Sequence, residues 1–152
     1  MSTYIEGKAL RQLHMGRKVD SAVATVPQTA EATLFNVAGG RVKVLQITGT
    51  ITTVMGAVAT NIRLRHTPTG GAAGNLCADR ASANDAAGAM YGITGTVANA
   101  LAYSTDALAA QVTPLVLRTG TISWITNANN TGACQWSILY VPIDDGASIA
   151  AA

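Results

Sequence analysis

Apolar and polar residues alternate along most of the chain after residue 31. In one such segment Ile62 and Leu64 alternate with Arg63 and Arg65, which is the pattern of a strand with one buried side and one solvent-facing side. The same period of two, interrupted by turns rich in Gly and Pro, predicts about eight strands. They span residues 32–37, 42–54 with a bend near residue 49, 58–64, 76–78, 89–97, 115–117, 121–126 and 133–141.

Turn signals between these segments predict how the strands connect. A Gly-Gly pair at 39–40 follows the first strand, so we expect the strands before residue 65 to form an antiparallel meander. The last two strands, joined by the turn 127–132, are predicted to form a hairpin that pairs Trp124 with Trp136. The expected fold is all-β: a two-sheet antiparallel β-sandwich, with the jelly roll as the first topology.

The two ends of the chain differ from this core. Residues 1–30 contain internal glycines and lack strand alternation, so we interpret them as an extended N-terminal arm with at most one short helix. Ile5 and Leu13 would share one face of that helix. We expect a β-sandwich domain over residues 31–143 and a C-terminal tail over residues 144–152.

Composition narrows the class of protein. The chain of 152 residues has single-domain length, and only 12% of its residues are charged, with a net charge of +2. Alanine, threonine and glycine dominate, which excludes a coiled coil, a strongly basic nucleic-acid binder and a disulfide-dense scaffold. Because a lone soluble domain normally carries more charge, we expect other copies of the chain or a partner to cover much of the surface.

The sequence lacks the segments that would direct it to secretion or to a membrane. The chain has no signal-peptide run and no apolar stretch long enough to span a membrane, so we expect synthesis in a cytoplasm and no membrane partner. Cys77 and Cys134 lie far apart and outside any CxxC pattern. In a reducing compartment they are predicted to be free, buried thiols, with a disulfide as the alternative.

Few residues are available for catalysis or for metal binding. The two histidines are His14 in the arm and His66 at a strand end, where we expect a solvated side chain, and no triad context accompanies them. Asp79, Asn84 and Asp85 share one loop whose oxygen atoms suit a hard cation, but we interpret them as residues that cap their own backbone. We therefore predict no enzyme, no catalytic residues, no cofactor and no metal site.

Basic residues give the strongest candidate for a binding surface. No acidic residue lies between Glu31 and Asp79, and four cations there fall on outward positions of two strands that we expect to be neighbours. An acidic protein surface fits such a patch, whereas nucleic acid does not, because exposed aromatics are not interleaved with the charges. The alternative is a solvated face neutralised by distant loop residues such as Asp85 or Asp106. With four cations of the arm, the predicted partner-binding set is Lys8, Arg11, Arg17, Lys18, Arg41, Lys43, Arg63 and Arg65.

Four segments carry a resemblance to a known class of proteins: 32–42 (ATLFNVAGGRV), 75–79 (NLCAD), 91–96 (YGITGT) and 140–147 (YVPIDDGA). With the Ala, Gly and Thr content, these segments resemble small structural proteins of tailed bacteriophages, and among them the capsid decoration, or cement, proteins. The resemblance implies a β-sandwich on the outside of a phage capsid that clamps neighbouring major capsid protein subunits. It also implies synthesis in the host cytoplasm and a homo-oligomer, for which we expect a trimer.

Two other functions stay open at this point. One is a tail- or fibre-associated sandwich that binds a host surface or its carbohydrate, which requires a few convergent aromatic and polar groups. The other is a small hydrolase or lyase on a jelly-roll scaffold, which requires clustered His, Glu or Asp side chains inside a cavity. The sequence offers few residues for either site.

Overall fold

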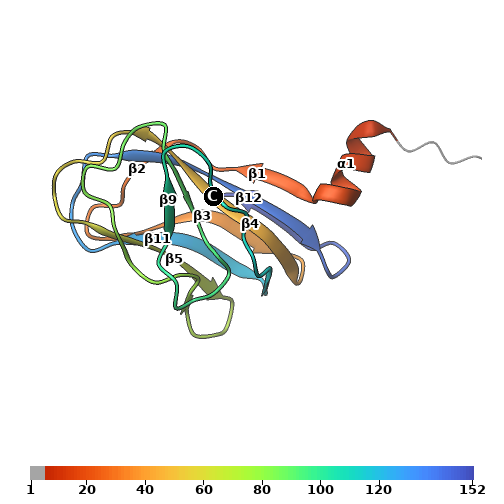
Figure 1. Ribbon diagram of the computed structural model, residues 1–152. Coiled ribbons are helices and arrows are strands. Elements are labelled where there is room, and N and C mark those ends of the chain that lie inside the picture. The colour runs from red at the N-terminus through yellow and green to blue at the C-terminus, as the bar shows by residue number, and fades with distance from the viewer. Residues whose placement is uncertain (1–5) are drawn as a thin grey trace, which may run out of the picture.

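The computed structural model describes residues 6–152 as two antiparallel sheets packed face to face, with one short helix, α1 (Gly7–Met15), outside them (Figure 1). Sheet A contains β1 (Arg17–Asp20), β2 (Ala24–Thr25), β4 (Val42–Thr53), β8 (Met90–Gly92), β9 (Ala102–Ser104), β10 (Leu115–Leu117) and β12 (Ala133–Pro142). Sheet B contains β3 (Glu31–Ala38), β5 (Asn61–Pro68), β6 (Gly74–Asn75), β7 (Arg80–Ala81), β11 (Gly120–Thr126) and β13 (Ser148–Ala151). The prediction of an all-β, two-sheet antiparallel sandwich is confirmed. The segment 76–78 is not a strand, because it runs between β6 and β7 and makes only a single bridge, from Ala78 to Ala100.

Strands that follow one another in the sequence do not pair as we expected. β3, β4 and β5 are consecutive, but β4 belongs to sheet A whereas β3 and β5 flank β11 in sheet B. The predicted meander is therefore wrong, because the glycine turn after β3 carries the chain across the core and not back along the same sheet. Alternation buries the same side chains in either arrangement, so it does not distinguish them.

The predicted hairpin of the last two long strands is also wrong. β11 pairs with β3 and β5, and β12 pairs with β4 and β1, so the two strands lie in opposite sheets. Trp124 and Trp136 still meet, because both point into the space between the sheets, with ring centroids 5.8 Å apart in an edge-to-face arrangement. Tyr91 stacks against Trp136 at 6.2 Å, and these three fully buried rings form the centre of the core.

A glycine makes room for this aromatic centre. Gly49 lies opposite Trp136 in the register of β4 and β12, and a Cβ atom added there would lie 2.8 Å from Cε3 of the indole ring. The pairing of β4 with β12 is in continuous register at this point, so no β-bulge lies at Gly49. The register shifts of this pair fall at residues 44–46 and 51–53 of β4. The glycine is required because the ring packs directly on the backbone of β4.

Both ends of the described chain are more ordered than we expected. β1 and β2 pair with β12, so residues 17–25 belong to sheet A and the arm reduces, within the described residues, to α1. The expected tail contains a strand, because β13 pairs with β3 and buries Ile149. Each end thereby covers a strand whose backbone groups would otherwise be unpaired. Ile5 lies outside the described residues.

Candidate functional site

The helix α1 stands beyond the end of the sandwich, joined to β1 by a single residue (Figure 1). Gly16 ends the helix with φ +84°, and its N–H donates a hydrogen bond to the carbonyl oxygen of Gln12 at 3.0 Å. A Cβ atom on Gly16 would lie 2.7 Å from the carbonyl oxygen of Tyr140 and 3.3 Å from Leu45. Only glycine satisfies both the backbone conformation and this close approach, so Gly16 fixes where α1 leaves sheet A.

No residue of α1 is buried against the rest of the chain. Leu10 and Leu13 are 47% and 70% exposed, and Met15 at the last turn is 60% exposed. Their spacing places Leu10 and Leu13 on one side of the helix, whereas Lys8 and Arg11, also three residues apart, lie on another. The result is a basic amphipathic helix whose apolar side has little to pack against.

An apolar groove of about 450 Å³ lies between α1 and the end of β12. Leu13 forms one wall, and Val141 and Pro142 form the opposite wall. Arg17 also lines the groove and brings a positively charged residue to it. The complete lining is Ala9, Gln12, Leu13, Gly16, Arg17, Tyr140, Val141 and Pro142.

A second, smaller hollow lies on sheet A next to the end of α1. It measures about 260 Å³, and Met15, Lys18 and Leu139 are among its lining residues. Leu139 and Val141 alternate with the buried residues of β12, so they point outward and are only half-buried. The outer face of sheet A is therefore apolar where α1 joins it.

The cations of the described chain divide into two groups. Five of them form ion pairs: Arg41 with Asp144 (2.7 Å), Arg63 with Asp79 (2.7 Å), Arg65 with Glu31 (3.1 Å), Lys18 with Asp20 (3.0 Å) and Arg80 with Asp85 (3.1 Å). The cations of residues 6–152 without such a partner are Lys8, Arg11, Arg17, Lys43 and Arg118. The unpaired positive charge is therefore concentrated on a few elements.

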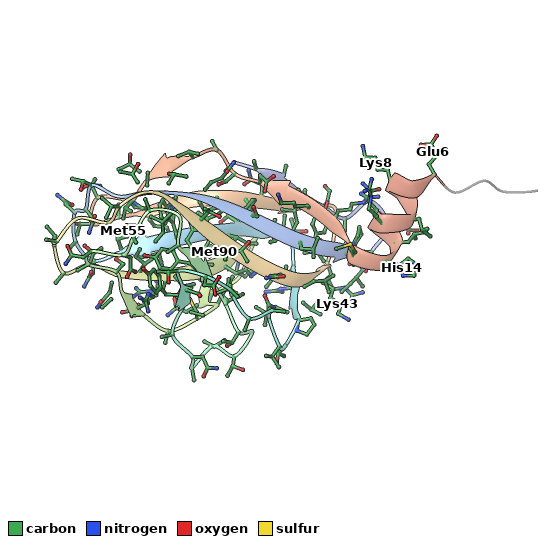
Figure 2. All side chains as sticks on the ribbon, turned by 45° about the horizontal axis from the view of Figure 1, so that its top comes forward. Glu6, Lys8, His14, Lys43, Met55 and Met90 are labelled. Atoms are coloured by element: carbon green, nitrogen blue, oxygen red, sulfur yellow. The ribbon has the colours of Figure 1, made fainter. Side chains whose placement is uncertain are left out.

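Four of these five unpaired cations lie at the α1 end of the molecule, and Arg118 lies elsewhere, beside His66. Lys8 and Arg11 belong to the helix, Arg17 lies opposite Tyr140 on β1, and Lys43 lies opposite Val141 on β4. Figure 2 shows Lys8 and His14 on α1 and Lys43 on the sheet, at the same end of the molecule. We call Lys8, Arg11, Arg17 and Lys43, together with the groove, the helix-end surface.

The eight basic residues predicted to bind a partner do not form one surface. Arg41 and Lys43 lie on or beside β4 in sheet A, whereas Arg63 and Arg65 lie on β5 in sheet B, so the assumption that the two strands are neighbours is wrong. The outward cations of β5 are neutralised by Asp79 and Glu31. The neutralising carboxylates are these two and not the loop acids named above. Glu31 reaches Arg65 from β3 across the intervening strand β11, and Asp79 lies in the segment between β6 and β7, both of which pair with β5.

Two ion pairs near the helix-end surface show how local carboxylates are held. Arg41 donates two side-chain hydrogen bonds and its backbone N–H to Asp144, which lowers the pKa of that carboxyl group to about 2. The Ser137 hydroxyl and then Lys18 lower the pKa of Asp20 below its ordinary value. Both carboxylates are engaged within the chain, so they do not neutralise the helix-end surface.

The other candidates for chemistry serve the fold. His66 is buried and not solvated as we expected, because it lies against the turn before β11, where its Nε2 donates to the carbonyl oxygen of Arg118 at 3.0 Å. Burial lowers the pKa of His66 and keeps the ring neutral. Asp85, of the loop considered for a cation, accepts hydrogen bonds from Tyr91 at 2.7 Å and from Arg80. Within residues 6–152 no three His, Cys, Asp or Glu side chains are grouped to hold a metal ion.

Cys77 and Cys134 are buried and unpaired, as predicted. Desolvation by burial raises the pKa of both thiols, that of Cys134 to about 12. Neither thiol is a nucleophile at neutral pH.

Comparisons with protein-family models, with curated proteins and with solved structures find no match to this chain. Residues 6–152 contain a single helix, α1, which is too short and too polar to cross a membrane. The aromatic side chains of residues 6–152 are buried except for Tyr103, which is half-buried beneath the guanidinium group of Arg80 at 4.4 Å.

Sequence reasoning identified part of the helix-end surface and missed the rest. Lys8, Arg11, Arg17 and Lys43 were among the predicted residues, but the groove was not predicted. The signal for it is present in the sequence, because Leu139 and Val141 make the second face of the last strand apolar near its end. What the sequence did not reveal is that α1 lies beside that face.

Proposed function

We propose that this chain is a non-enzymatic structural protein of a tailed-phage virion, which binds the outside of the capsid and clamps neighbouring major capsid protein subunits. The observation that carries the proposal is α1, a nine-residue helix with no buried residue beside an apolar groove and unpaired cations. An isolated helix shorter than about 12 residues is only marginally stable in water. Because α1 buries no residue against its own chain, the surface of the partner on which it docks would stabilise it.

In this proposal two different parts of the chain provide the rigid body and the binding surface of the clamp. The two sheets with their aromatic core provide a rigid body, and the helix-end surface binds the acidic surface of a capsid subunit. An ordinary interface buries about 800 Å² on each partner, and engagement of a repeating lattice by a homo-oligomer, such as the expected trimer, adds avidity. Apolar residues exposed away from α1, such as Val97 and Val112, supply surface for contacts with sister copies or with the shell.

The alternative functions have less support. A carbohydrate site in a tail or fibre component normally uses exposed aromatic rings, and the described residues place theirs in the core. A hydrolase or lyase site requires grouped titratable side chains in a cavity, whereas the two hollows beside α1 described above are mainly apolar. A third, polar hollow of about 320 Å³ is lined by Arg17, Asp144 and Asp145, but Arg41 already binds Asp144 there. We therefore retain the capsid decoration function as the conclusion.

The first test is the copy number of the chain in density-purified phage particles from its source, measured by quantitative mass spectrometry against the major capsid protein. We expect a ratio within a few-fold of one, as for a protein spread over the whole shell. A handful of copies per particle would indicate a tail component and overturn the assignment to the capsid. Absence from the particle would overturn the virion assignment altogether.

A matched pair of variants tests the role of α1. Leu13→Ser and Val112→Ser each replace an exposed apolar side chain, 70% and 83% exposed, but only Leu13 belongs to the helix-end surface. We expect Leu13→Ser to lower the occupancy of undecorated shells at limiting protein concentration and Val112→Ser to leave it unchanged. Equal occupancy of both variants and the wild type would contradict docking through α1.

A further inference from the structure

We propose that the groove between α1 and β12 binds a short acidic segment of the partner, with one bulky apolar side chain of that segment seated between Leu13 and the Val141–Pro142 wall. The chemistry of the bound segment follows from the groove itself. Its assignment to the major capsid protein rests on the function proposed above.

The shape of the groove favours a side chain as its occupant. Its volume of about 450 Å³ lies within the range of about 300–1,000 Å³ that is usual for ligand pockets, and its walls come from two different elements. Leu13 from the helix faces Val141 and Pro142 from the strand, so an inserted apolar group contacts both. The close approach of Gly16 to the carbonyl oxygen of Tyr140 sets where the two walls meet, because a Cβ atom there would lie 2.7 Å from that oxygen.

The charges around the groove favour an acidic segment. Arg17 lines the groove, Lys43 lies opposite Val141 on the adjacent strand, and Lys8 and Arg11 extend the positive charge along α1. None of the four makes an ion pair among residues 6–152. Carboxylates of a partner would therefore gain charge-assisted contacts without displacing existing ones.

The same charges argue against two other occupants. A second copy that presented the same end would bring like charges together, because the acids there without ion pairs, Glu6 and Asp145, are fewer than the unpaired cations. An anionic bilayer matches the charge but not the shape, because a flat surface leaves a concave groove unfilled. The outer face of sheet B is a poor candidate for the acidic segment, since Arg63 and Arg65 are already paired.

The test uses the full-length protein and a fluorescent eight-residue peptide composed of Glu and Asp around a central Leu-Phe pair. Two control peptides replace either the acidic residues by Gln and Asn or the Leu-Phe pair by Ala-Ala. Binding is measured by fluorescence anisotropy, and vesicles of anionic phospholipid serve as a further probe. We expect the acidic apolar peptide to bind at least about tenfold more tightly than either control peptide. Equal binding of all three peptides, or tighter binding to vesicles than to the peptide, would overturn the inference.

A matched pair of double variants tests the location. Arg11→Gln with Arg17→Gln and Arg63→Gln with Arg65→Gln change the net charge equally, the first at the helix-end surface and the second on sheet B. We expect the first pair to weaken peptide binding by about tenfold and the second by less than about twofold, with unchanged far-UV circular dichroism. Equal weakening would mean non-specific attraction by net charge and would refute the groove as the site.

The outcomes for the groove and for the virion function are separable. If the peptide binds as expected but the chain is absent from purified particles, the groove stands and its acidic partner lies outside the virion. If the chain is abundant in particles and the Arg11→Gln, Arg17→Gln variant decorates shells normally, the virion function stands and the groove inference is wrong.

Discussion

The contact between Gly49 and Trp136 gives the sharpest test of the core. In Gly49→Ala, the added methyl group would lie 2.8 Å from Cε3, 2.9 Å from Cζ3 and 3.0 Å from Cδ2 of the Trp136 ring. Carbon atoms pack at about 3.5–4.0 Å, so the ring would have to move by roughly 0.5–1 Å. The ring is fully buried between Trp124 and Tyr91, which leaves it little room to move.

The magnitude follows from two opposing effects. Overpacking a buried site costs about 1–3 kcal/mol, and three close contacts on a confined ring place this site at the upper end. Replacing glycine by alanine in extended backbone raises the free energy of unfolding by about 0.4–1 kcal/mol, because it reduces the entropy of the unfolded chain. We therefore expect Gly49→Ala to lower the free energy of unfolding by about 2 kcal/mol, which corresponds to a fall in Tm of about 4–8 °C for a domain of this size.

Urea denaturation followed by far-UV circular dichroism measures this effect. Gly74→Ala is the matched control, because Gly74 also lies in a strand but a Cβ atom there meets nothing within 4 Å. We expect the control to stay within about 0.5 kcal/mol of the wild type. Combining Gly49→Ala with Trp136→Phe, which shrinks the clashing ring, should cost less than the sum of the two single substitutions. A Gly49→Ala protein as stable as the control, or strictly additive effects, would refute the packing argument.

Three further predictions concern titratable groups. The carboxyl group of Asp144, followed by NMR, should titrate at a pKa of about 2 and move toward its ordinary value in Arg41→Gln; because the folded-state pKa is lowered, the stabilisation it brings is present above about pH 4 and is lost as the pH falls toward 2. An unshifted midpoint in Arg41→Gln would contradict this. Cys77 and Cys134 should resist a water-soluble thiol reagent in the folded protein and react, two per chain, after unfolding. Modification of the folded protein as fast as that of an exposed thiol would contradict the burial of both side chains. Burial lowers the pKa of His66, so the unfolded chain binds its proton more tightly, and the free energy of unfolding should fall as the pH drops below about 6.5. Denaturation midpoints between about pH 5 and 7.5 should show a weaker dependence in His66→Gln, and an unchanged slope would assign the effect to other groups.

Local sequence determined the long strands of the sandwich and which of their side chains are buried, whereas the short strands β1, β2 and β13 at the chain ends were not predicted. Alternation placed Ile62 and Leu64 in the core and left Arg63 and Arg65 outside, as the structure has them. The small number of charged residues and the unpaired Cys77 and Cys134 were likewise accessible from composition and spacing. These properties depend on residues within a few positions of one another, and the period of the side chains reports them directly.

The pairing of strands, and with it the candidate site, was decided only by the tertiary structure. A strand buries the same face whether its neighbour in sequence lies beside it or across the core, so alternation left β3, β4 and β5 free to be assigned to one sheet. That error merged two pairs of cations that lie on different sheets. Which carboxylate neutralises a cation depends on residues as distant as Arg41 and Asp144, whose contact is created by the register of whole strands. The helix-end surface exists for the same reason, because α1 and the end of β12 meet only after the sheet has brought opposite ends of the chain together.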